Sequence, residues 1–66
     1  MDKRKLQELF DNVFDEHQCV RACGRQACID LIEYMEIYTS LNVGNAHTGI
    51  MNVDTLVSEY NRLMNC

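Results

Sequence analysis

Apolar residues recur at the start of the chain with the spacing of one face of an α-helix. Over residues 3–15 they fall at positions i, i+3, i+4, i+7 and i+8, and charged residues occupy the other faces. Asp2 precedes this segment and is suited to accept hydrogen bonds from the first helical amides. The pattern therefore predicts a helix over about residues 3–15, with apolar positions Leu6, Leu9, Phe10, Val13 and Phe14.

The same apolar spacing continues almost without interruption into the middle of the chain. Taken literally it describes one helix over residues 3–39, about 55 Å long at 1.5 Å per residue. The alternative is a break near Asp15, because Asp15 followed by Gln18 has the pattern of a capping box. A break with Gly24 just after a helix end is a weaker option. We favour the break near Asp15, which predicts a second helix over residues 17–39.

Residues 40–52 are rich in asparagine and glycine, which favour turns. They predict a loop that is long for a small domain, and such loops often carry function. We therefore consider Asn45, His47 and Thr48 as possible partner-binding residues. After the loop, helical periodicity returns and predicts a third helix over residues 53–64.

The predicted fold is all-α: a small three-helix domain spanning residues 1–66, with a long central helix. A chain of this size buries only about 60% of the surface that it exposes when unfolded. Small domains of this kind gain stability from disulfides, metals or oligomerisation. With neither of the first two evident, we predict a helical homodimer. Its predicted interface comprises Phe10, Phe14, Ile29, Ile32, Tyr34, Ile37 and Tyr38.

The net charge of −4 disfavours binding to nucleic acid, because a phosphate backbone attracts a basic surface. A dimeric DNA-binding regulator remains an alternative, since Arg21, Arg25 and Gln26 would share one arc of the predicted central helix. No apolar run is long enough to span a membrane, and the first residues do not resemble a signal peptide. We expect a cytoplasmic protein with reduced cysteines.

Four soft metal ligands occur within twelve residues: His17, Cys19, Cys23 and Cys28. Zinc prefers a tetrahedron of such ligands. Spaced along a helix, however, these side chains would point in different directions, so they are weak candidates. We expect no metal and no cofactor. A metal- or redox-responsive module is kept as a second alternative.

No nucleophile and base are placed together by the sequence, so we expect no enzymatic activity. The leading hypothesis is a small interaction protein, a regulator or inhibitor that binds another protein. Small size and acidic composition are in keeping with a bacterial or phage accessory protein.

Overall fold

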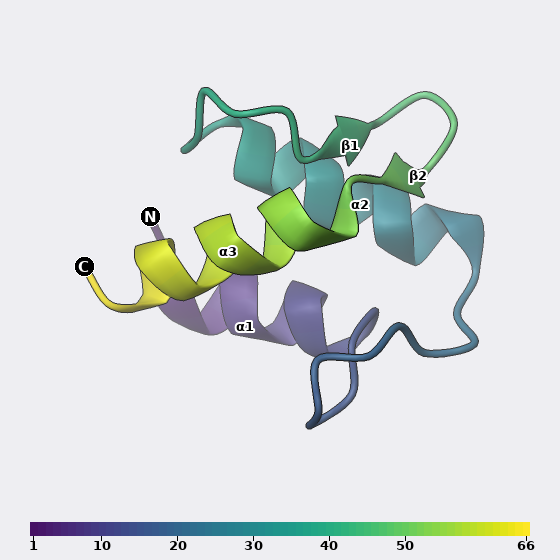
Figure 1. Cartoon of the computed structure of the whole chain (residues 1–66), viewed down its shortest axis with the longest axis horizontal. Helices are drawn as coiled ribbons and strands as arrows, with labels where there is room; N and C mark the ends of the chain where they lie inside the picture. The colour runs from purple at the N-terminus through teal and green to yellow at the C-terminus, as the bar shows by residue number, and fades with distance from the viewer.

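The computed structural model describes every residue from Met1 to Cys66 and contains three helices and one short hairpin (Figure 1). The strands pair antiparallel, with Gly44 opposite Met51 and Asn45 opposite Ile50. The prediction of a purely helical fold is therefore wrong, because the asparagine- and glycine-rich segment forms a hairpin. The elements are α1 (Lys3–Asp11), α2 (Arg25–Glu36), β1 (Gly44–Asn45), β2 (Ile50–Met51) and α3 (Val53–Met64).

Local sequence signals predict the start of α1 and the extent of α3. The carboxylate of Asp2 accepts hydrogen bonds from the amides of Arg4 and Lys5 at 3.0 and 3.2 Å, which confirms it as the N-cap. Helix α3 covers residues 53–64, the range that the periodicity predicts.

Helix α1 ends at Asp11 and not near residue 15 as predicted, because the chain folds back on the end of the helix. Phe14 pairs with Val20 in an isolated antiparallel bridge. Arg21 follows this bridge, and its Nε donates to the backbone oxygens of Asp11 and Phe14 at 2.9 and 3.0 Å. These carbonyls would otherwise lack partners at a helix end. The end of α1 is thus set by a residue ten positions further along.

The interruption predicted near Asp15 is present, but it spans all the residues from 12 to 24. Its centre is a tight turn in which the Asp15 carboxylate accepts from the amides of His17 and Cys19 at 2.8 and 2.9 Å. These hydrogen bonds, chiefly that of Cys19, lower the pKa of Asp15. Gln18 adopts a positive φ of 61°, which a right-handed α-helix does not allow. Asp15 therefore caps a turn and not a helix.

The long central helix is also a wrong prediction. Helix α2 begins at Arg25 with Gly24 as its N-cap, and it ends at Glu36. The longest dimension of the whole molecule is 28 Å, half of the 55 Å that the unbroken helix would need. A long central helix that needs a second copy to cover it is therefore not an argument for a homodimer, and the argument from small size is unaffected. The oligomeric state itself stays a prediction.

The core lies where α3 packs across α1 and α2 (Figure 1). The ring of Phe10 on α1 stacks on Phe14 at 4.4 Å between centroids and on Tyr60 of α3 at 3.6 Å. The C-terminus of α3 lies beside the start of α1, where Lys3 Nζ donates to the backbone oxygen of Cys66. The buried apolar residues are Leu6, Phe10, Val13, Phe14, Cys28, Leu31, Ile32, Met35, Val43, Leu56, Tyr60 and Leu63.

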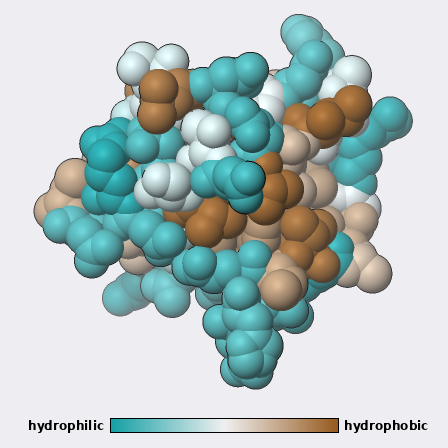
Figure 2. Space-filling view, in the orientation of Figure 1, coloured by the Kyte–Doolittle hydropathy of each residue, from teal (hydrophilic) through white to brown (hydrophobic).

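The core is not fully covered by polar side chains. On the face that carries α3, apolar residues gather in the middle and hydrophilic residues border them (Figure 2). Half-buried Met51, Val57 and Met64 pack against the core at its margin. Incomplete coverage is expected for a chain of this size, because its surface is large relative to its volume.

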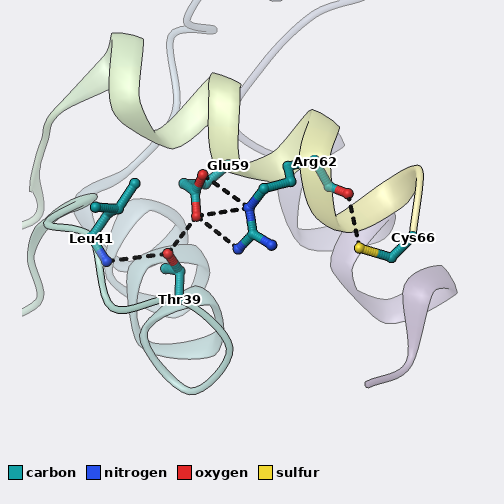
Figure 3. Close-up of polar contacts among 5 residues, drawn as sticks. All are labelled: Thr39, Leu41, Glu59, Arg62 and Cys66. Carbon is teal, nitrogen blue, oxygen red and sulfur yellow. Dashed lines mark hydrogen bonds and ion pairs between the residues drawn. The ribbon is translucent and has the colours of Figure 1, made fainter.

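An ion pair within α3, between buried Glu59 and half-exposed Arg62, is tied to the segment after α2 by a hydrogen bond from Thr39 (Figure 3). Helical spacing predicts Glu59 on the outer face, but its side chain is buried. Arg62 donates to both of its carboxylate oxygens, the shortest contact being 2.8 Å, and the Thr39 hydroxyl donates to Oε1 at 2.6 Å. The hydrogen bonds from Arg62 and then from Thr39 lower the pKa of Glu59. Thr39 also accepts from the amide of Leu41, so Glu59 fixes how the chain leaves α2.

Candidate functional site

The concave surface with the largest volume lies against the β1–β2 hairpin. This hairpin cleft is open and has a volume of about 590 Å³. Polar side chains predominate in it, and Ile50, which is 70% exposed, is its most exposed apolar residue. The lining residues are Glu36, Asn42, Gly44, Asn45, Ala46, His47, Ile50, Met51 and Asn52.

Two of the three predicted partner-binding residues are engaged by the hairpin's own backbone. The Asn45 carboxamide oxygen accepts from the amide of His47 at 2.8 Å, and the Thr48 hydroxyl accepts from the amide of Ile50 at 3.3 Å. His47 itself is exposed at the cleft. Asn45 and Thr48 therefore shape the turn, as asparagine and threonine commonly do.

Two glycines allow the hairpin to lie directly on α2. A Cβ on Gly44 would come within 2.9 Å of a side-chain carbon of Ile32. Gly49 has a φ of 78°, and a Cβ there would lie 2.6 Å from the side chain of Arg25 at the start of α2. Only glycine fits such a close approach without strain. The hairpin therefore packs directly against α2, with Gly49 beside the first residue of the helix and Gly44 beside Ile32.

A second concave surface lies between α1 and α2, with a volume of about 340 Å³. We call it the α1–α2 groove and define it by the residues Lys5, Leu9, Asp30, Glu33, Tyr34 and Ile37. Ile37, the residue that follows α2, is 69% exposed. The exposed Tyr38 extends the apolar surface, because its ring lies 5.3 Å from that of Tyr34.

The Tyr34 ring in the wall of this groove is held in place by contacts with Asp2 and Lys5. The Tyr34 hydroxyl accepts from the Asp2 amide at 3.2 Å and lies 3.3 Å from the Asp2 carbonyl, to which it donates. Lys5 Nζ stands 5.9 Å from the centre of the Tyr34 ring, within the range of a cation–π contact. A wall that is already ordered loses little conformational entropy when a partner binds.

Charge in the groove is predominantly acidic. Asp30 and Glu33 face a single lysine, Lys5. Asp30 accepts from Gln26 at 2.9 Å, whereas the exposed Glu33 carboxylate forms no ion pair or hydrogen bond. The groove therefore combines an apolar floor with an unneutralised carboxylate.

The residues predicted for a dimer interface do not form one surface. Phe10, Phe14 and Ile32 are buried in the chain's own core, so they are not free to contact a second copy. Ile29 is half-buried. Tyr34, Ile37 and Tyr38 do lie together at the α1–α2 groove. The sequence pattern indicates the apolar position Leu9 and an acidic stretch over residues 30–36 that suits a basic protein surface, but it does not show that they lie beside one another.

The predicted metal-ligand candidates are divided between two places. His17 and Cys19 are exposed in the turn that Asp15 caps. Cys23 and Cys28 lie together before and within α2, with 3.8 Å between their sulfur atoms. No group of three or more His, Cys, Asp or Glu side chains is placed to hold a metal ion.

The basic arc considered for DNA recognition is not assembled on one helix. Arg21 lies in the loop, and its Nε is turned back to cap α1. Arg25 contacts the hairpin turn at Gly49, and Gln26 is bonded to Asp30. The DNA-binding alternative thus has no structural observation in its favour.

Comparison with models of protein families, with curated proteins and with solved structures gave no match. None of the three helices has the length and apolar character needed to cross a bilayer.

Proposed function

We propose that this chain is a small, non-enzymatic regulator that acts by binding another protein through the α1–α2 groove. The observation that carries the proposal is the combination of exposed Ile37 and ordered Tyr34 with the unpaired carboxylate of Glu33. Large apolar and aromatic side chains supply most of the affinity at protein interfaces, and charge at the rim selects the partner.

The proposed occupant is a segment of a partner protein with an apolar side chain flanked by lysine or arginine. The apolar side chain packs on Leu9, Tyr34 and Ile37, and the basic residue faces Asp30 and Glu33. The chain's net charge of −4 attracts such a segment at long range. The proposal also keeps the cytoplasm as the compartment, in which four free thiols would be stable.

A displayed library of random peptides tests this proposal. Peptides selected on the immobilised, reduced chain are sequenced, and the affinity of one enriched peptide is measured by fluorescence anisotropy. We expect apolar residues next to lysine or arginine to be enriched. Failure to enrich such sequences would contradict the proposal.

Matched isoleucine variants then locate the binding surface. Ile37 and Ile50 are 69% and 70% exposed, so arginine at either position leaves the core intact. We expect Ile37→Arg to weaken peptide binding at least tenfold, Glu33→Lys to weaken it and reduce its salt dependence, and Ile50→Arg to leave it unchanged. Loss of binding in Ile50→Arg alone would move the site to the hairpin cleft.

Light scattering of the same proteins distinguishes a different partner from a second copy. A monomeric mass near 7.7 kDa leaves the groove free for another protein. A dimer that Ile37→Arg dissociates would instead assign the groove to self-association and overturn the proposed partner.

A further inference from the structure

Two of the four cysteines lie in contact at the start of α2. The Sγ atoms of Cys23 and Cys28 are 3.8 Å apart. Cys23 is half-buried just before the N-cap Gly24, and Cys28 is buried at the end of the first turn of the helix. The other two cysteines, Cys19 and Cys66, are exposed and contact no other sulfur.

The distance between the two sulfur atoms is short enough for a covalent bond after a small movement. A disulfide has a sulfur–sulfur distance of about 2.05 Å, so the atoms must approach by about 1.8 Å. Gly24 separates Cys23 from the helix, and no atom lies within 4 Å of the position that its Cβ would occupy. Because glycine has no Cβ, more backbone conformations are open to the chain next to Cys23 than another residue would allow.

We infer that Cys23 and Cys28 form a dithiol site that is converted to an intramolecular disulfide by a low-molecular-weight disulfide such as glutathione disulfide. The inference is independent of the proposed binding function, because neither cysteine lines the α1–α2 groove. It also replaces the metal reading of these residues with one that needs only two sulfur atoms.

The two cysteines take different roles because their exposure differs. The thiolate of Cys23, the more exposed residue, attacks one sulfur of glutathione disulfide, whose sulfur–sulfur bond breaks and releases one glutathione thiolate. Cys28 then gives its proton to solvent and its Sγ attacks the Cys23 Sγ, which releases the second glutathione. Two protein thiols are oxidised and glutathione disulfide is reduced to two thiols. The two protons that the cysteines lose pass through solvent to the two released glutathione thiolates. Burial raises the pKa of Cys28, in keeping with its role as the second thiol to react.

Trypsin provides a direct test on the natural chain, because cleavage after lysine and arginine puts each cysteine in a separate peptide. Cys19, Cys23, Cys28 and Cys66 fall in residues 6–21, 22–25, 26–62 and 63–66. The folded chain is equilibrated in a glutathione redox buffer, its free thiols are alkylated at low pH, and the digest is analysed by mass spectrometry. We expect residues 22–25 linked to residues 26–62, and the link to disappear after reduction.

The denatured chain is the control for proximity in sequence. Cys23 is four residues from Cys19 and five from Cys28, so an unfolded chain should form the two short disulfides to similar extents. We expect the ratio of the Cys23–Cys28 link to the Cys19–Cys23 link to be at least tenfold higher in the folded chain. A ratio that folding leaves unchanged would overturn the inference. So would a folded chain in which Cys19 and Cys66 carry glutathione while Cys23 and Cys28 remain thiols.

Single serine variants test the order of the two steps. With Cys28→Ser, Cys23 should accumulate a stable mixed disulfide with glutathione, because no second thiol resolves it. With Cys23→Ser, the buried Cys28 should remain largely reduced. The opposite pattern, with glutathione on Cys28 and none on Cys23, would contradict the assigned roles.

Discussion

Substitution of Gly24 tests where the second helix begins. Gly24 is the N-cap of α2, with φ and ψ of −75° and 161°, and it provides no side chain to cap the first amides. Any L-residue can adopt this conformation, and nothing lies within 4 Å of a Cβ there. Gly24→Asp would add a capping carboxylate at the positive end of the helix dipole, whereas Gly24→Ala would add neither.

The expected difference between the two variants follows from the capping geometry. An aspartate N-cap is worth about 1 kcal/mol over alanine. The helix dipole adds roughly 0.3–1 kcal/mol. At roughly 4–8 °C per kcal/mol for a domain of this size, Gly24→Asp should melt at least 4 °C above Gly24→Ala. If residues 17–39 formed one continuous helix, Gly24→Ala would instead melt above Gly24→Asp, because alanine exceeds aspartate in helix propensity by up to about 0.7 kcal/mol.

Thermal unfolding followed by circular dichroism, with reductant present, measures this order. Gly24→Asn is the control for charge, since asparagine caps as well as aspartate does but leaves the net charge at −4. It should also melt above Gly24→Ala. A Gly24→Ala protein more stable than both capping variants would refute the assignment of the start of α2 to residues 24 and 25.

Three further predictions concern the core, the buried carboxylate of Glu59 and the hairpin. Phe14→Ala should lose about 3–5 kcal/mol in urea unfolding, because its side chain is 0% exposed, whereas Val20→Ala at a half-exposed site should change stability little; equal losses would contradict the packing. The pKa of Glu59 in the folded chain is lowered from 4.5. Its ionised carboxylate therefore adds to the free energy of unfolding above about pH 4.5, and this contribution is lost as the pH falls through the pKa of the folded chain. Melting temperatures from pH 7 to 2 should therefore show Glu59→Gln less stable than the natural chain near neutrality, with the difference shrinking in acid; Glu8→Gln, at an exposed carboxylate, controls for the lost charge. Gly49→Ala should destabilise by at least about 1 kcal/mol because of its φ of 78°, and an unchanged urea midpoint would contradict that conformation.

Part of the candidate site follows from the sequence and part does not. Tyr34, Ile37 and Tyr38 stand out as apolar residues on more than one face of a helix, and that pattern signals an additional contact surface. Their partner across the groove, Leu9, belongs to α1, and only tertiary packing brings α1 beside α2. The contact between Cys23 and Cys28 is likewise invisible in the spacing, because it depends on Cys23 lying outside the helix.

The sequence by itself determined the elements whose ends depend on neighbouring residues. The Asp2 cap and the periodicity over residues 53–64 act within one or two helical turns, so their consequences can be read locally. Tertiary structure decided the rest. An apolar stripe is compatible with a continuous helix and with a broken one, and Arg21, returning to cap Asp11, selects the broken form. In the same way, Glu59 is buried at a position where Thr39, twenty residues away, donates a hydrogen bond to its carboxylate. Capping and burial of polar groups depend on partners that are close in space, and helical periodicity carries no information about such partners.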